Sequence, residues 1–259
     1  MGVANLLFLF SGVIQTTPYP VFADVYIGTQ GPYRFLVDTG AETSLIDSRL
    51  AAELRLQPEF RVEMITQLTK RVVPAANLRT LRVAQQTLPE TEVAFVDVTE
   101  ARLMAPSVKG VLGLNALSGL DFTLSPESGR LDLAAQRPEG EVVPFSRIEG
   151  RIAVKTQMGR ESLTLILDSG STHVVLFRTP AAMAKTRPVS ATFTTLDGAR
   201  SVVPTVWTAD LVFTDRLRVG MLPAAVVERK GTQVEGLLPA SIFKQVHVDQ
   251  TRGELVLVR

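Results

Sequence analysis

Two aspartates, Asp38 and Asp168, stand in the same local sequence pattern. In each copy a run of large apolar residues ends in Asp, and a hydroxyl residue and a glycine follow: Phe35-Leu36-Val37-Asp38-Thr39-Gly40 and Leu165-Ile166-Leu167-Asp168-Ser169-Gly170. An apolar strand that ends in a carboxylate places a charge at the edge of a core, where burial is costly. One such aspartate could be a turn residue, but two in the same pattern predict a pair of carboxylates that face each other.

A facing pair of carboxylates can hydrolyse a peptide bond without a metal ion or a covalent nucleophile. The reaction needs a base that activates water and an acid that polarises the carbonyl group. Because two like charges at that distance resist ionising together, the pair holds one proton and supplies both groups. Gly40 and Gly170 let the backbone approach the carboxylates and offer N–H donors. The hydroxyls of Thr39 and Ser169 can form hydrogen bonds between the two loops.

The composition argues against several other chemistries. The chain has no cysteine, which excludes disulfides, a thiol nucleophile and cysteine-bound metal. It has only two histidines, His173 and His247, which disfavours a histidine zinc site. The formal net charge is +1 and the basic residues are scattered, so no electrostatic field attracts nucleic acid. We therefore expect no cofactor, no metal ion and no nucleic-acid partner.

The similarity between the two halves extends beyond the aspartates. Two further motifs recur in the same order: Gly110-Val111-Leu112-Gly113 as Gly236-Leu237-Leu238-Pro239, and Val72-Val73-Pro74 as Val202-Val203-Pro204. This pattern indicates one ancestral unit used twice. Prolines and glycines between the halves predict a linker. We expect an N-terminal lobe over 21–136, a linker over 137–147 and a C-terminal lobe over 148–259, preceded by a segment over 1–20.

The segment over 1–20 has two possible interpretations. Leu6-Leu7-Phe8-Leu9-Phe10 lies in an apolar stretch about as long as a signal-peptide core, and it is too short to span a bilayer. No Lys or Arg precedes it and no A-x-A cleavage site follows, which argues against a signal peptide. The alternative is a buried strand at the start of the first lobe. An exported location, periplasmic or secreted, is favoured over a cytoplasmic one.

Short β-type runs dominate both halves, and few helices are expected. Asp47 is predicted to cap a short helix after the first Asp motif, and Thr179 to cap its counterpart in the second half. Asp197-Gly198 predicts a hairpin turn between β-rich flanks. The loop over 197–201 is longer than the corresponding loop over 69–71. We therefore expect the second hairpin to reach further and to act as a flap over the aspartates.

These motifs resemble the signatures of a known family. Asp38-Thr39-Gly40-Ala41 resembles the retropepsin signature, and Asp168-Ser169-Gly170-Ser171 resembles the pepsin signature. Gly110-Val111-Leu112-Gly113 resembles the second signature of the same group, a loop that passes near the active aspartate. On these motifs, residues 21–259 are similar to a pepsin/retropepsin-like (clan AA) aspartic protease of the bacterial type, with both lobes in one chain.

The resemblance implies an all-β, bilobal pepsin-like acid protease fold with few short helices. It implies an aspartic endopeptidase in which Asp38 and Asp168 are catalytic. The residues that support the active-site loops are then Thr39, Gly40, Ser169, Gly170 and Ser171, and the flap candidates are Asp197 and Gly198. The implied partner is a peptide or protein substrate, and the implied state is a monomer.

The sequence departs from the family pattern in ways that affect the flap and the substrate range. Pro239 stands where a glycine is expected, and because proline has no N–H the loop packing there must differ. The pepsin flap tyrosine has no counterpart, since Tyr19, Tyr26 and Tyr33 all precede Asp38. The pepsin disulfides are absent as well. An inactive pepsin-fold protein that binds a peptide or a partner is the alternative function.

Two polar residues close to the aspartates have more than one possible role. His173 is either a polar residue on the wall of its loop or a pH sensor, and the first role is favoured. Glu42 is either solvated, paired with an arginine, or part of the rim of the cleft.

Overall fold

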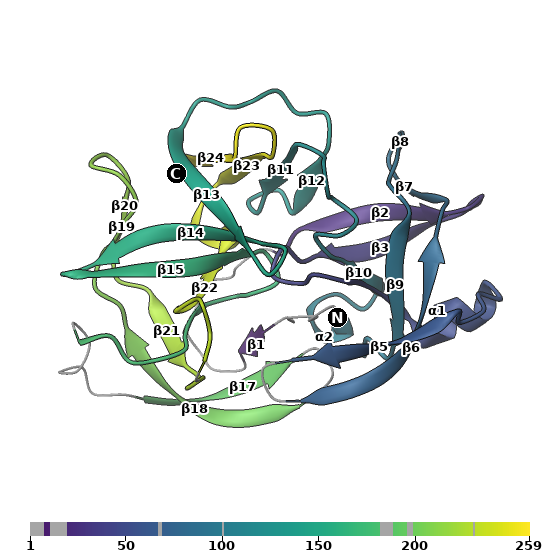
Figure 1. The fold of residues 1–259 in the computed structure, drawn as a ribbon, viewed down its shortest axis with the longest axis horizontal. Helices are drawn as coiled ribbons and strands as arrows, with labels where there is room; N and C mark the ends of the chain where they lie inside the picture. Colours follow the sequence, from purple (N-terminus) through teal and green to yellow (C-terminus); the bar gives the residue numbers. More distant parts are fainter. Residues whose placement is uncertain are drawn as a thin grey trace.

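The protein folds into two lobes of β-strands. The computed structural model describes residues 8–10, 20–66, 69–99, 101–181, 189–195, 199–229 and 231–259. Within these ranges the chain is mostly strand, with few and short helices. Figure 1 shows the two lobes side by side, with a further group of strands above them. The expected mostly-β fold with two lobes and few short helices is therefore confirmed.

The first lobe contains strands and two short helices in the following order: β2 (Phe22–Ile27), β3 (Gln30–Val37), β4 (Ser44–Asp47), α1 (Ser48–Glu53), β5 (Phe60–Ile65), β6 (Lys70–Leu78), β7 (Leu81–Val83), β8 (Gln86–Thr87), β9 (Thr91–Val96), α2 (Ala101–Met104) and β10 (Val108–Leu112). The alternation of apolar and polar residues in the sequence explains why these segments form strands. In β2, for example, Ala23, Val25 and Ile27 are buried and alternate with more exposed residues, as expected for a sheet with one covered face.

The second lobe contains strands and one 3₁₀ turn in the following order: β14 (Arg151–Met158), β15 (Glu161–Asp168), β16 (Val174–Leu176), β17 (Val189–Thr195), β18 (Arg200–Trp207), β19 (Leu211–Val212), β20 (Arg218–Val219), β21 (Pro223–Val226), β22 (Gly236–Pro239) and η2 (Ala240–Ile242). Its strands pair as those of the first lobe do. β10 lies parallel to β3 and antiparallel to β4, and β22 lies in the same way against β15 and β16. β9 is parallel to β4, and β21 is parallel to β16.

A third group of strands joins the lobes: β11 (Phe122–Ser125), β12 (Arg130–Asp132), β13 (Glu141–Ile148), β23 (Gln245–Asp249) and β24 (Glu254–Val258). They form an antiparallel sheet in the order β12-β11-β23-β24-β13, which Figure 1 shows above both lobes. β11 follows the first lobe in sequence and β23 follows the second, so this sheet ties the halves together. Its residues Phe122, Leu124, Val246 and Val248 are almost fully buried in the main core.

Part of the expected linker over 137–147 is a strand rather than a turn-rich loop. β13 pairs with β24 through Glu141–Pro144 and with β14 through Phe145–Ile148, so it passes from the central sheet into the second lobe. The backbone groups of this segment are satisfied by strands far away in sequence. Pro144 and the neighbouring glycines, which predicted a linker, carry no information about those partners.

The N-terminal segment contributes a short strand, β1 (Phe8–Phe10), within the described residues. β1 pairs antiparallel with β17, with Phe8 opposite Thr195 and Phe10 opposite Phe193. It therefore adds to the hairpin of the second lobe and not to the start of the first lobe. In the part of the chain that the structure describes, no helix has the length and apolar character needed to cross a bilayer.

The first predicted helix is confirmed. α1 follows Asp47, whose carboxylate accepts a hydrogen bond from the Arg49 N–H at 3.0 Å. The counterpart after Thr179 falls largely on residues 182–188, outside the described residues.

The paired strands of the two hairpins are equally long, and the expected difference in their turns involves residues outside the described ranges, so it stays a prediction. β5–β6 pairs from Phe60↔Ala75 to Ile65↔Lys70, and β17–β18 pairs from Val189↔Thr205 to Thr194↔Arg200, which is six residue pairs in each ladder. Lys70 was expected at a hairpin tip, but it pairs within the ladder and forms an ion pair with Glu63 at 2.8 Å. Backbone pairing does not need apolar side chains, so it continues past the last apolar residues. The turns predicted between apolar residues were therefore placed incorrectly.

Candidate active site

Asp38 and Asp168 end equivalent strands in the middle of the molecule. Asp38 follows β3 directly, and its N–H donates to the Leu112 carbonyl in β10 at 3.0 Å. Asp168 is the last residue of β15 and pairs with Pro239 of β22. The apolar residues before each aspartate are at most 1% exposed, so they anchor the strand ends in the two lobe cores. Both carboxyls are buried as a result, with Asp38 0% and Asp168 2% exposed.

Each carboxyl group packs against the glycine of the opposite loop. A Cβ atom at Gly40 would lie 2.5 Å from Cγ of Asp168, and one at Gly170 would lie 2.6 Å from Cγ of Asp38. Real Cβ atoms do not tolerate such distances, so each loop needs a glycine because of the carboxyl on the other lobe. The structure therefore brings Asp38 and Asp168 together, as the duplicated motif predicts.

Backbone N–H groups hold one oxygen of each carboxylate. Oδ1 of Asp38 accepts hydrogen bonds from Gly40 and Ala41 at 2.9 and 3.2 Å. Oδ1 of Asp168 accepts them from Gly170 and Ser171 at 2.8 and 2.9 Å. These bonds fix the carboxyl planes and leave Oδ2 of each group for its partner.

The hydroxyls of Thr39 and Ser169 connect the two loops. Oγ1 of Thr39 donates to the Leu167 carbonyl at 2.8 Å and accepts from the Ser169 N–H at 3.0 Å. Oγ of Ser169 donates to the Val37 carbonyl at 2.7 Å and accepts from the Thr39 N–H at 3.0 Å. All four hydrogen bonds cross the boundary between the lobes and all are buried. They hold the two aspartates at one fixed separation.

Burial raises the pKa of both carboxyls, because the charged form loses its water. The pKa of Asp38 lies well above its usual range, through burial first and repulsion by Asp168 second. Burial raises the pKa of Asp168 to about 6, and a hydrogen bond from Asp38, its N–H donors and the charge of Arg151 limit that rise. Oδ2 of Asp38 is buried without a hydrogen-bond donor among the described residues. A proton shared between the two carboxyls would give this oxygen a partner.

Comparison with known proteins agrees with this geometry. Residues 23–116, which include the Asp38 loop and most of the first lobe, match the family model described as aspartyl protease. This match covers the first aspartate motif, Asp38-Thr39-Gly40-Ala41, and the motif Gly110-Val111-Leu112-Gly113.

Two solved structures show a distant likeness to this chain. An aspartic proteinase from Irpex lacteus is 12% identical, with 93% of this chain and 94% of that chain covered and a TM-score of 0.46. A retropepsin-like aspartic protease from Rickettsia conorii is 12% identical, with 45% of this chain and 87% of that chain covered and a TM-score of 0.31. A search of curated proteins gives no significant match. The family resemblance rests on the match over 23–116.

Pro239 departs from the clan AA pattern, and the structure explains how the second lobe accommodates it. In the first lobe the Gly113 N–H donates to Oγ of Ser44 at 3.0 Å, and that hydroxyl donates to Oδ1 of Asn115 at 2.8 Å. The strand registers make Pro239 and Val174 the counterparts of Gly113 and Ser44. The second lobe thus lacks both the N–H donor and the hydroxyl acceptor, so neither is left unsatisfied.

The structure describes Ser171 and His173, two other residues singled out from the sequence, but not Asp197 and Gly198. Oγ of Ser171 donates to the His173 carbonyl at 2.7 Å, and Nδ1 of His173 lies 2.9 Å from Oγ1 of Thr172. Burial lowers the pKa of His173, whose side chain packs in the wall of the loop. Asp197 and Gly198 lie outside the described residues, and their role as a flap stays a prediction.

Sequence reasoning missed one charged residue at the site, Arg151. Its side chain is 3% exposed, and Nε lies 3.4 Å from Oε1 of Glu42. Of the roles open to Glu42, the structure therefore shows pairing with an arginine. A possible signal was the position of Arg151 at the start of the apolar run Ile152-Ala153-Val154, where a charge needs a buried partner.

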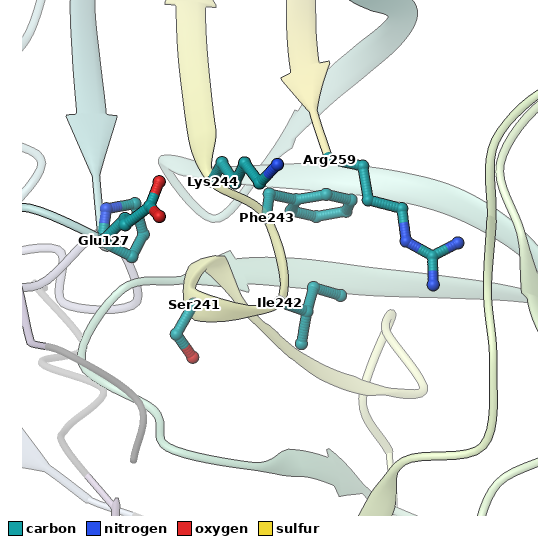
Figure 2. Close-up of a pocket in the computed structure, with 7 residues that line it drawn as sticks. Glu127, Ser241, Ile242, Phe243, Lys244 and Arg259 are labelled. Atoms are coloured by element: carbon teal, nitrogen blue, oxygen red, sulfur yellow. The ribbon is translucent and has the colours of Figure 1, made fainter. Parts of the chain in front are cut away.

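A hollow elsewhere in the described structure has a lining of a different kind. A hollow of about 340 Å³ lies near the ends of β23 and β24, and Figure 2 shows its lining side chains, among them Glu127, Phe243, Lys244 and Arg259. None of the residues singled out from the sequence lines it. Within the described ranges, no group of three or more His, Asp or Glu side chains could hold a metal ion.

Proposed function

We propose that the protein is an aspartic endopeptidase that hydrolyses peptide bonds with Asp38 and Asp168. The observation that supports this most strongly is the reciprocal packing of two buried carboxyls, each against the other lobe's glycine and each with one oxygen free of backbone donors. Such a pair meets the two needs of the reaction, a base for water and an acid for the carbonyl. Neither aspartate is replaced, which favours catalysis over binding alone.

The environments of the two carboxyls suggest their roles. Burial and the charge of Asp168 raise the pKa of Asp38, whereas hydrogen bonds from Asp38 and the backbone and, last, the charge of Arg151 limit the rise at Asp168. In the proposed reaction, Asp168 takes a proton from water and Asp38 donates its proton to the carbonyl oxygen of the peptide bond, while the water oxygen bonds to the carbonyl carbon. Asp168 then gives its proton to the nitrogen and Asp38 takes one back from a hydroxyl of the gem-diol. The carbon–nitrogen bond breaks, a carboxylic acid and an amine leave, and the pair is again protonated on Asp38.

We also propose that the two lobes descend from one duplicated unit. This is supported by the recurrence of the Asp motif and by the matching strand pairings of β3, β4 and β10 with β15, β16 and β22. The duplication accounts for both loops carrying the same carboxylate, hydroxyl and glycine at one interface.

Turnover of a denatured protein by the purified full chain between pH 3 and pH 6 tests the proposed activity. We expect cleavage, and we expect a statine-type transition-state mimic to block it, since such a mimic places a hydroxyl between two carboxyls. Asp24→Asn is a matched control, because Asp24 is an exposed residue of β2. Binding of the mimic or of peptides without any turnover would identify an inactive peptide-binding protein and refute the endopeptidase.

A further inference from the structure

Arg151 is a buried cation at the boundary between the lobes. It is the first residue of β14 and closes the turn from β13, in pairing with Ile148. Its guanidinium contacts Glu149 in that turn and Glu42 in the first lobe, with Nε 3.4 Å from Oε1 of Glu42. Burying a guanidinium without such partners costs several kcal/mol. The contacts therefore form a built cluster of one cation and two carboxylates.

The cluster lies beside both catalytic loops. Glu42 follows Asp38 by four residues in the first loop, and its side chain is 15% exposed. On the other side, β14 pairs with β15 as far as Ala153 opposite Ile166. Arg151 begins β14 and Asp168 ends β15, each two residues beyond that pair, at neighbouring ends of the two strands. Arg151 thus contacts the Asp38 loop through Glu42 and begins the strand next to the one that Asp168 ends.

The position that corresponds to Arg151 in the first lobe holds no cation. The pairing of Phe22 with Leu36, compared with that of Ala153 with Ile166, makes Pro20 the counterpart of Arg151. In the loops, Thr172 stands in the second lobe where Glu42 stands in the first. At these corresponding positions the bridge is therefore present once, and its cation comes from the strand beside Asp168.

We propose that Arg151 is a positioning residue that ties the Asp38 loop to the second lobe through Glu42 and makes the two aspartates unequal, with the negative charge on Asp168 and the proton on Asp38. This inference rests on the proposed function, because it assigns the base and the acid of that reaction.

The other charged groups around the cluster agree with this assignment. Glu42, Glu149 and Asp168 favour the charged form of Arg151, whereas Arg229 opposes it. The charge of Arg151 in turn lowers the pKa of Asp168, after burial and the hydrogen bonds of that carboxyl, and the main causes that act on Asp38 include no cation. Burial lowers the pKa of His173, in the Asp168 loop. An opposite charge within about 4–6 Å of a carboxyl lowers its pKa by about one unit or more.

The test is a carboxyl ¹³C NMR titration of the full chain, which needs no enzymatic activity, together with the pH profile of kcat/KM. In Arg151→Met we expect the lower apparent pKa of the aspartate pair to rise by about one unit. Glu42→Gln leaves the charge of Arg151 less neutralised, so the lower apparent pKa of the pair should fall or stay unchanged. Arg151→Lys should restore most of the wild-type value. Arg178→Met, at an exposed ion pair of the same lobe, should change nothing.

Under the proposal the apparent pKa rises in Arg151→Met but does not rise in Glu42→Gln. Loosened packing would instead shift the apparent pKa of both variants in the same direction. An unchanged apparent pKa in a folded Arg151→Met, or a rise of similar size in Glu42→Gln, would overturn the proposal. If Arg151→Met does not fold, Glu42→Gln and Arg151→Lys still decide between an electrostatic effect and loosened packing. If the wild type shows no turnover, the proposed function fails, and the titration still reports whether Arg151 makes the aspartates unequal.

Discussion

The two aspartate loops are alike in the atoms that touch the carboxyls and differ in the layer behind them. Both loops present two N–H donors to Oδ1, a hydroxyl to the other lobe and a glycine to the opposite carboxyl. Behind the first loop lies the polar network of Ser44 and Asn115, whereas Val174 and Pro239 lie behind the second. The difference teaches that the reacting geometry tolerates little change, while its support can be polar or apolar.

The largest effect is expected from closing the space between the loops. In Gly40→Ala or Gly170→Ala the new Cβ would lie about 1 Å too close to the opposite carboxyl carbon, which two N–H bonds hold in place. Misplacement of that size costs on the order of 100-fold in kcat, and the lobes must also separate slightly. Steady-state kinetics and thermal unfolding check both effects.

Gly220→Ala is the control for that experiment, because the nearest atom to its Cβ would be 3.9 Å away and its backbone is not left-handed. Equal kinetics for Gly40→Ala and Gly220→Ala would show that the loops are less closely packed than described.

A smaller loss is expected when one cross-lobe hydroxyl is removed. Ser169→Ala deletes the bond to the Val37 carbonyl and leaves the buried Thr39 N–H without an acceptor. An unsatisfied buried group costs about 1–3 kcal/mol, so Tm should fall by roughly 5 °C at this chain length. Thr39→Val removes the corresponding hydroxyl of the first loop and should lower Tm by a similar amount.

The double variant Thr39→Val/Ser169→Ala tests whether these hydroxyls act as one unit. Because they share partners, the double change should cost less than the sum of the single changes. Additive losses of Tm would mean that the two loops are held independently.

The pH dependence of stability provides a third comparison between the aspartates. Because burial raises the pKa of Asp168 from 3.8 to about 6, folding favours its protonated form. Its contribution is fully present below about pH 4 and is lost as the pH rises through about 6. Asp38→Asn removes the neighbouring charge and supplies a permanent hydrogen-bond donor.

We therefore expect Asp38→Asn to lose less stability than the wild type between pH 4 and pH 7, and to have a higher Tm at pH 7 by about 5 °C. Thermal unfolding at both pH values measures this. Parallel Tm–pH curves for the two proteins would indicate that the aspartate pair carries no strained charge.

The smallest effects are expected in the supporting layer, and they should have opposite causes in the two lobes. Ser44→Ala leaves the Gly113 N–H buried without its acceptor and should cost about 1–2 kcal/mol. Pro239→Ala should cost a similar amount, about 1–2 kcal/mol, because it adds a buried N–H where Val174 offers no acceptor. Urea unfolding of both variants compares them. Unchanged stability in Pro239→Ala would contradict our account of the second layer.

Local features of the site could be predicted from the sequence, because neighbouring residues determine them. The aspartates, the hydroxyls beside them, the glycines and the cap of α1 by Asp47 all follow from short motifs. The strand order was also accessible, since the motifs recur in the same order in both halves.

Features that depend on distant partners could not be predicted in the same way. The pairing of β11 with β23, the strand β13 within the expected linker, and the contact of Glu42 with Arg151 each join segments about 100 residues apart. The two hairpins, whose ladders contain six residue pairs each, were also not predictable from side-chain types, since the backbone register sets where the turns fall.

The most direct test of the central claim is kcat/KM for Asp38→Asn, Asp168→Asn and the double variant, measured on one peptide substrate with Asp24→Asn as control. Because the two carboxyls act as one unit, each single change should lower activity by several orders of magnitude and the double change should lower it little further. Near-normal turnover in either single variant would contradict the account, because the reaction would then depend on another site.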